Sequence, residues 1–172
     1  MLAKNIAPGL KRSFAFEEWP WVEEQLVAAL RKEAQASIKA DLVLDIAGSD
    51  IDARMIEIAK KNAFAAGVEQ DIVFKQMRVQ DLRTDKINGV IISNPPYGER
   101  LLDDEAIVTL YREMGQTFEP LKTWSKFILT SDELFETRFG QQADKKRKLY
   151  NGTLKVDLYQ FFGQRVKRQV QG

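Results

Sequence analysis

Apolar residues recur along much of the chain every three or four positions, the spacing that places side chains on one face of a helix. This periodicity predicts helices over 17–36, over 53–66, over 104–118 and, briefly, between a cap at Ser131 and a stop at Gly140. Asp52 and Gly67 stand where the second of these helices needs its N-cap and its left-handed terminating residue. We therefore expect that helix to begin after Asp52 and to end at Gly67.

Short apolar runs separate these helices and predict strands. The runs cover 42–46, 72–81, 89–93 and 126–130. The third is apolar almost without interruption, which is typical of a parallel strand buried on both faces.

The last part of the chain has a different pattern. Apolar residues alternate behind Asn151-Gly152, at Leu154, Val156 and Leu158, which predicts a β-hairpin. Strands that alternate with helices imply a parallel sheet. The fold class expected is therefore α/β, with a mostly parallel sheet that ends in an antiparallel hairpin.

The composition narrows the possible chemistry. At 172 residues, 44% hydrophobic and 30% charged, the chain has the length and composition of one globular domain. No apolar run approaches the roughly 18 residues of a membrane helix, and no signal peptide is visible, so a cytoplasmic location is expected. The chain has no cysteine and no histidine, which excludes thiol nucleophiles and leaves no expectation of a metal site.

The most specific motif is Asn94-Pro95-Pro96-Tyr97, directly after the predicted strand at 89–93. An exocyclic base amine is a poor nucleophile because its lone pair is delocalised into the ring. The side-chain oxygen of Asn94 and the carbonyl of Pro95 can accept its two hydrogens, which favours a tetrahedral, nucleophilic nitrogen. Pro96 stiffens the turn, and Tyr97 offers a face for an extruded base. The alternative is an ordinary tight turn.

Acidic residues end two other predicted strands. Asp50 can accept the hydroxyl protons of a ribose, whereas Asp52 is better explained as a helix cap. Asp81 can accept from the amino group of an adenine, unless it is a solvated loop acid. With the adjacent apolar residues Ile51 and Leu82, these acids form the candidate cofactor site.

Basic residues gather before the hairpin, although the net charge of the chain is only +1. Arg100 follows the catalytic motif, next to Glu99. Phosphate contact is the functional interpretation of these cations, and a solvated face is the alternative. The candidate RNA-binding residues are Arg100, Lys145, Lys146, Arg147 and Lys148.

Taken together, these motifs resemble the C-terminal methyltransferase domain of the bacterial 23S rRNA guanine-N2 methyltransferases that carry a THUMP RNA-binding domain. The resemblance covers nearly the whole chain. It implies a Rossmann-like methyltransferase fold, S-adenosyl-L-methionine as cofactor, and guanine N2 in ribosomal RNA as target. The segments that carry it are Asn5-Ile6-Ala7-Pro8-Gly9-Leu10, Phe16-Glu17-Glu18-Trp19, Gly48-Ser49-Asp50-Ile51-Asp52, Asn94-Pro95-Pro96-Tyr97-Gly98-Glu99-Arg100-Leu101 and Lys148-Leu149-Tyr150-Asn151-Gly152.

The chain departs from the family pattern at its start. That family begins its fold with a strand and a glycine-rich cofactor loop, whereas Met1 resembles an internal position. Residues 1–172 are therefore expected to form a partial, N-terminally truncated methyltransferase domain. The strands at 42–46 and 89–93 would normally flank the missing strand, so we expect exposed edges there. The alternatives are a fragile fragment, strand exchange with another copy, or separation from an N-terminal part by truncation, cleavage or a misassigned start.

Two other functions remain open. An adenine-N6 or protein-glutamine methyltransferase can share the Asn-Pro-Pro-Tyr chemistry. The chain can also be an inactive or RNA-contacting remnant of a guanine-N2 enzyme.

Overall fold

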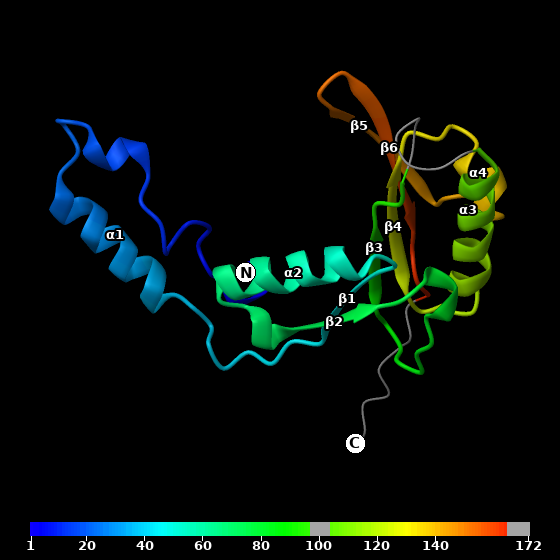
Figure 1. The fold of residues 1–172 in the computed structure, drawn as a ribbon, viewed down its shortest axis with the longest axis horizontal. Coiled ribbons are helices and arrows are strands. Elements are labelled where there is room, and N and C mark those ends of the chain that lie inside the picture. Colours follow the sequence, from blue (N-terminus) through cyan, green and yellow to red (C-terminus); the bar gives the residue numbers. More distant parts are fainter. Residues whose placement is uncertain (97–103, 165–172) are drawn as a thin grey trace. The chain divides into compact units, whose positions relative to one another are not determined.

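The computed structural model describes residues 1–96 and 104–164, and its internal contacts divide the chain into two units, Met1–Gln76 and Met77–Gly172 (Figure 1). Each unit is described by itself below. Tyr97 and Arg100 lie outside the described residues.

The first unit is built around one parallel strand pair. Strand β1 pairs with β2 in register from Ile46 opposite Ile72 to Asp50 opposite Gln76. Helix α2 connects them, as a parallel pair requires, and its Ile56 and Ala63 are buried. The elements in chain order are η1 (Leu2–Lys4), η2 (Ala15–Glu18), α1 (Glu24–Ala36), β1 (Ile46–Asp50), α2 (Ala53–Ala66), η3 (Glu69–Asp71) and β2 (Ile72–Gln76), where η marks a 3-10 helix.

Both predicted caps of α2 are confirmed. The Asp52 carboxylate accepts a hydrogen bond from the backbone N–H of Arg54 at 2.8 Å. Gly67 ends the helix with φ 69°, a left-handed conformation that glycine adopts without steric cost.

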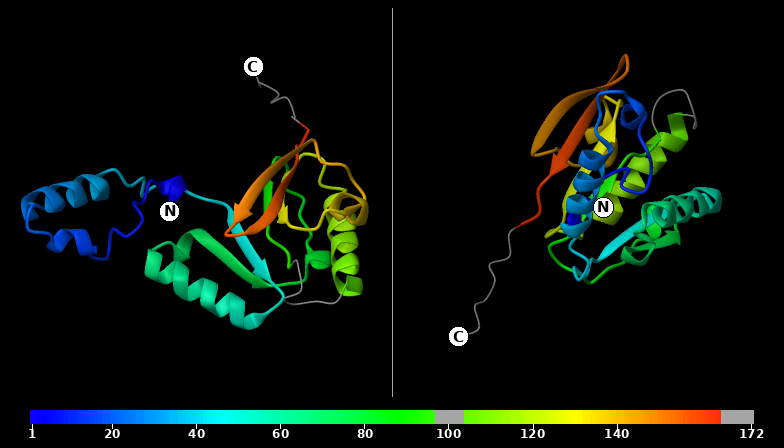
Figure 2. Two further views of the ribbon diagram at one scale, coloured as in Figure 1. Left: turned by 90° about the horizontal axis from the view of Figure 1, so that it is seen from above. Right: turned by 90° about the vertical axis from the view of Figure 1, so that its left-hand side faces the viewer.

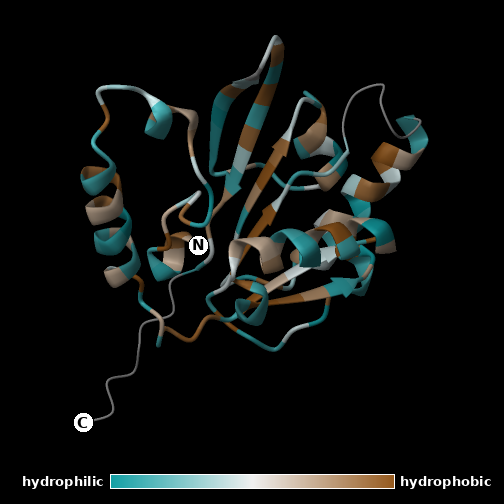
Figure 3. Ribbon diagram, turned by 60° about the vertical axis from the view of Figure 1, so that its left-hand side comes forward, coloured by the Kyte–Doolittle hydropathy of each residue, from teal (hydrophilic) through white to brown (hydrophobic). Residues whose placement is uncertain are grey.

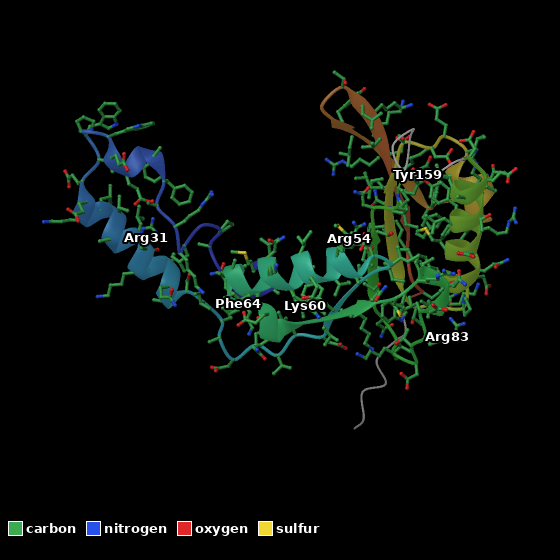
Figure 4. All side chains as sticks on the ribbon, in the orientation of Figure 1. Arg31, Arg54, Lys60, Phe64, Arg83 and Tyr159 are labelled. Atoms are coloured by element: carbon green, nitrogen blue, oxygen red, sulfur yellow. The ribbon has the colours of Figure 1, made fainter. Side chains whose placement is uncertain are left out.

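The helix predicted over 17–36 begins later, at Glu24. Trp19 is extended, with φ −74° and ψ 139°, because the residue before a proline is disfavoured in the helical region. The chain therefore breaks at Trp19-Pro20, and the preceding residues form the separate turn η2. Arg31 of α1 donates to the carbonyls of Leu10 and Arg12, which precede η2, at 2.8 and 2.7 Å (Figure 4). These bonds hold the N-terminal loop against α1.

Two strand predictions in this unit were wrong in their limits. The run at 42–46 lies outside the sheet except for Ile46, and Val43 is 92% exposed. Pairing with β2 starts only at Ile46. The limits of β1 therefore follow its hydrogen bonding to β2 and not the apolar run in the sequence. The strand predicted over 72–81 ends at Gln76, and a 3-10 helix follows it.

The second unit contains a four-stranded sheet in the order β3-β4-β6-β5. Strands β3 and β4 are parallel, whereas β6 is antiparallel to both of its neighbours. The elements are η4 (Val79–Asp81), β3 (Val90–Ser93), α3 (Asp104–Phe118), β4 (Ser125–Thr130), α4 (Phe135–Phe139), β5 (Lys145–Asn151) and β6 (Leu154–Phe161).

The main hydrophobic core lies between one face of this sheet and the helices α3 and α4 (Figure 2). Strand β4 alternates half-buried and buried residues, as expected when one face packs against helices. Figure 3 shows polar and apolar residues alternating along much of β6, the second strand of the hairpin. The core residues are Ile107, Tyr111, Met114, Phe118, Ile128, Phe135, Phe139, Tyr159 and Phe161.

Strand β3 is not buried on both faces as its sequence suggested. Ile91 packs against the core, but Val90 and Ile92 are 59% and 81% exposed. Among the described residues, β3 pairs with β4 alone and β1 with β2 alone.

Two local predictions in this unit also need correction. Ser131 does not cap α4, because the N-cap is Leu134 and the Asp132 carboxylate binds the Leu134 N–H at 2.8 Å. The hairpin exists, but its two-residue turn is Gly152-Thr153, since Asn151 still pairs with Leu154. Gly152 has φ 63°, which suits this tight turn.

Candidate active site

The first unit places Asp50 at the carboxyl end of β1, as the last residue of the strand. Its Oδ1 accepts a hydrogen bond from the backbone N–H of Asp52 at 2.8 Å, which orients the exposed carboxylate. The neighbouring Ile51 is 62% exposed, and its carbonyl accepts from the side chain of Gln76 at 3.0 Å. This contact joins the carboxyl ends of β1 and β2, where ligands of parallel sheets bind.

The side chain of Asp52 is already engaged in capping α2. Besides the Arg54 N–H, its carboxylate binds the Arg54 guanidinium, with a shortest distance of 2.7 Å. The hydrogen bonds from Arg54 hold the pKa of Asp52 below its ordinary value. Of the two neighbouring acids, Asp50 is therefore the one whose position suits a ligand.

The second unit holds Asp81 at the end of the short helix η4, with its side chain exposed. Leu82 follows and packs, partly buried, against the main core. The Arg83 guanidinium donates to the carbonyls of Gln80 and Leu82, both at 2.8 Å (Figure 4). These contacts fix the backbone on both sides of Asp81.

The Asn94-Pro95-Pro96 turn leaves the carboxyl end of β3. The side chain of Asn94 is exposed, whereas Pro95 is buried and Pro96 is half-buried. The Pro96 carbonyl accepts a hydrogen bond from the Tyr111 hydroxyl at 3.3 Å. An exposed amide on a fixed, buried turn is suited to hold a planar polar group.

Tyr111 of α3 makes a contact with the turn that the sequence did not predict, through its hydroxyl. The side chain is fully buried, and its ring meets the edge of Phe135 with centroids 4.9 Å apart. Its hydroxyl also lies 2.9 Å from the hydroxyl of Thr130. Burial raises the pKa of Tyr111 above its ordinary value, so the hydroxyl keeps its proton and can donate.

The four consecutive cations of the hairpin do not form one patch. Side chains alternate across a strand, so Lys145 and Arg147 of β5 share one face and Lys146 and Lys148 the other. Lys146 already has protein partners, since its ammonium lies 4.7 Å above the Tyr159 ring and 3.7 Å from the Glu136 carboxylate.

Across the described ranges, no group of three or more acidic side chains is arranged to hold a metal ion. In those same ranges no helix is long and apolar enough to span a membrane.

Asp50 and Asn94 lie at the carboxyl ends of parallel strands, where open α/β sheets bind their ligands. Comparison with known proteins identifies the family. Residues 1–160 match the RMKL-like methyltransferase domain family, and the chain belongs to this family. It has the Rossmann-like methyltransferase fold of its structural relatives.

Two curated relatives indicate the kind of protein it resembles. YpsC of Bacillus subtilis (strain 168), provisionally named as an RNA methyltransferase, is 49% identical over 162 residues, which are 94% of this chain and 42% of YpsC. Ribosomal RNA large subunit methyltransferase K/L of Shewanella amazonensis is 35% identical over 177 residues, covering 99% of this chain and 25% of the relative.

Two solved structures match closely. SMU.472, provisionally described as a methyltransferase and crystallised with SAH, superposes with a TM-score of 0.93 at 66% identity, covering 97% of this chain and 44% of SMU.472. A protein of Listeria monocytogenes described from prediction as an N6-adenine-specific DNA methylase gives 0.88 at 50% identity, covering 95% and 42%. The chain thus spans less than half the length of these relatives.

Proposed function

We propose that this chain carries the base-binding part of an S-adenosylmethionine-dependent methyltransferase that modifies an exocyclic amine in ribosomal RNA, with guanine N2 as the target. The observation that carries the proposal is the Asn94-Pro95-Pro96 turn, with an exposed amide at the end of β3 and a carbonyl fixed by Tyr111.

The turn would act on the amine itself. The Asn94 amide oxygen and the Pro95 carbonyl would each accept one N–H of the amine and draw its nitrogen toward a nucleophilic geometry. S-adenosylmethionine, which Asp50 and Asp81 would hold, would supply an electrophilic methyl group on a sulfonium, with the sulfur as leaving group. Asn94 and Pro95 would direct the amine nitrogen toward that methyl group, and the nitrogen would release one proton to water. Catalysis rests on alignment, which needs neither histidine nor cysteine.

Two carboxylates fit the cofactor because they can accept hydrogen bonds from its hydroxyl and amino groups. Asp50, oriented by the Asp52 N–H, would accept the ribose hydroxyl protons. Asp81 would accept from the adenine amino group, with Ile51 and Leu82 as the apolar neighbours. The cofactor assignment is supported by SMU.472, which was crystallised with SAH.

Ribosomal RNA is proposed as the substrate because one relative is named for large subunit ribosomal RNA. Lys145, Arg147 and Lys148 on β5 would contact phosphates, together with Arg100. Lys146 would join them only by leaving its contact with Tyr159. Guanine N2 follows from the resemblance of the sequence motifs. The name of the Listeria protein favours adenine N6 as the second candidate.

Binding is the first test. S-adenosylmethionine is titrated calorimetrically into the whole chain and into Asp50→Ala. Saturable binding that the variant loses would support the cofactor site in this chain. Absence of binding would instead favour the remnant interpretation, in which the chain contacts RNA without catalysis.

The target is tested separately. The chain is incubated with ribosomal RNA and S-adenosylmethionine carrying a labelled methyl group, and the RNA is then digested to nucleosides. Labelled N2-methylguanosine that Asn94→Ala abolishes would support the proposal. Labelled N6-methyladenosine would transfer the assignment to the second candidate, and label on the protein would favour a glutamine target.

Self-association belongs to the same proposal. Among the described residues β3 pairs with β4 alone, and its Val90 and Ile92 are exposed. The other side of the strand would therefore be able to pair with a strand of a second copy.

A further inference from the structure

The second unit contains a chain of hydrogen bonds that ends on the Asn94-Pro95-Pro96 turn. The backbone N–H of Asp132 donates to the Thr130 hydroxyl at 3.1 Å. The hydroxyls of Thr130 and Tyr111 lie 2.9 Å apart, and the Tyr111 hydroxyl donates to the Pro96 carbonyl at 3.3 Å. A carbonyl can only accept, so Tyr111 gives its single proton to Pro96 and Thr130 must donate to Tyr111.

The origin of this chain is anchored on several sides. The Asp132 carboxylate binds the Arg138 guanidinium at 2.6 Å and the Leu134 N–H at 2.8 Å. Its backbone carbonyl accepts from the Tyr159 hydroxyl at 3.1 Å. Asp132 therefore cannot move without breaking contacts with α4 and β6, and each hydroxyl further along is oriented by the one before it.

The turn needs an outside donor because of its sequence. Pro95 and Pro96 have no backbone N–H, so the backbone of these two residues can accept hydrogen bonds but cannot donate them. The usual way of fixing a turn, by donation from its own backbone, is therefore closed at these two positions. A tyrosine hydroxyl supplied from α3 performs that task, whereas a phenylalanine would fill the same core space without it.

The same helix also holds the candidate cofactor segment. Gln80 of η4 satisfies its amide when its nitrogen donates to both carboxylate oxygens of Glu113 of α3, at 2.7 and 2.8 Å. Asp81 is the next residue. Helix α3 thus contacts both functional segments of this unit through polar side chains.

We infer that Tyr111, oriented by Thr130 and Asp132, is a positioning residue that sets the Pro96 carbonyl. Through the rigid Pro96 residue, which links the two peptide groups, it also sets the preceding Pro95 carbonyl, which accepts from the target amine. The inference rests on the proposed function, since it assigns a task within the same site. Tyr111 does not touch the reacting atoms and acts through the turn.

The structural test uses carbonyl chemical shifts. The chain has five prolines, so carbonyl-¹³C proline labelling gives a simple spectrum in which the Pro96 signal is identified by its loss in Pro96→Ala. Tyr111→Phe is expected to move the Pro96 signal, and Thr130→Val to move it in the same direction. Thr130→Ser, which keeps the hydroxyl, is expected to restore it. Tyr150→Phe is the matched control, because Tyr150 is 73% exposed on the hairpin.

The kinetic test separates positioning from general stability. Tyr111→Phe is expected to lower kcat about tenfold or more while the KM for S-adenosylmethionine stays unchanged and circular dichroism shows a folded chain. In an Asn94→Ala background the same change should have little further effect, since both act on one step.

The outcomes distinguish the two levels of the proposal. An unmoved Pro96 signal in Tyr111→Phe, or an unchanged kcat, overturns the positioning role even if the chain is an active methyltransferase. A moved signal in a chain that methylates no RNA keeps the control of the turn by Tyr111 but overturns its catalytic purpose along with the proposed function.

Discussion

Asp50, the last residue of β1, and Asp52, the N-cap of α2, show how neighbouring carboxylates can have different roles. Asp50 is oriented by a backbone N–H and faces outward, whereas Asp52 is bound by Arg54 and caps α2. The difference lies in their local hydrogen bonds and not in their residue type.

Substitution of each acid should separate cofactor binding from stability. Asp50→Asn keeps the oxygen that accepts from the Asp52 N–H but loses the charge. It is expected to weaken the binding of S-adenosylmethionine about tenfold or more, because charge-assisted hydrogen bonds are lost. Its unfolding temperature should stay close to that of the wild type. Calorimetric titration and thermal unfolding measure the two effects.

Asp52→Ala is the matched control. Loss of a helix cap should lower the unfolding temperature by several degrees, while the cofactor affinity at temperatures below unfolding should hold. The reverse pattern, with Asp52 controlling affinity, would mean that the two roles have been exchanged.

At this scale the local rule for helix caps succeeded at α2 and failed at α4, where Ser131 is not the cap. Asp52 and Gly67 were identified correctly because caps depend on neighbours one to four residues away. The role of Tyr111 was missed because its helical spacing predicts burial but says nothing of what its hydroxyl meets. That partner, Pro96, is defined only when β3, β4 and α3 are packed together.

The elements show where local pattern fails. The apolar run at 42–46 looked more like a strand than Ile46–Asp50, yet strand β1 forms where Ile46 pairs with Ile72. The helix expected over 17–36 is interrupted at Trp19-Pro20, a break that the proline itself could have indicated. Helix α3 was predicted with its observed limits, because its apolar periodicity and its tertiary contacts agree.

The hairpin strand β5 has two faces that should differ in RNA binding. Arg147 is exposed, whereas Lys146 is engaged with Tyr159 and Glu136. Arg147→Gln is therefore expected to weaken binding to ribosomal RNA and to lower the salt dependence, the slope of log K against log salt, by about 1. Fluorescence anisotropy at several salt concentrations measures both quantities.

Lys146→Gln provides the comparison on the same strand. It should change the salt slope less than Arg147→Gln does, because the ammonium is already partnered within the protein. Equal slopes for the two variants would show that Lys146 leaves Tyr159 to bind phosphate.

At the scale of the whole molecule, the buried core is unevenly shared between the two units. The described residues of the first unit contribute Ile56, Ala63 and Val68 to the buried apolar side chains. The second unit contributes a connected cluster of nine buried residues around α3, β4 and β6. Since apolar burial is the main stabilising contribution, the second unit should be the more stable.

Hydrogen exchange checks this difference. Backbone amides of β4 and β6 are expected to exchange last, through global unfolding, while those of α1 and β2 exchange earlier through local opening. The measurement is exchange followed by mass spectrometry on peptides from each unit. Equal protection of α1 and β4 would contradict the expected order and show that the first unit is stabilised by more than its own core.

The side of β3 away from β4 is expected to govern the behaviour of the whole chain in solution. Within the described ranges β3 pairs with β4 alone, and Ile92 is 81% exposed. A strand of this kind can act as a template for pairing with another chain. Ile92→Lys places a charge on that strand and is expected to shift the chain from dimer or larger species toward monomer in light scattering over a concentration series.

Ile87→Lys is the matched control, because Ile87 is 64% exposed but precedes the strand. If both variants associate like the wild type, β3 does not pair between copies, and any association of the chain runs through another surface. If Ile92→Lys alone becomes monomeric, pairing through β3 is the cause, since the two substitutions add the same charge to the same unit.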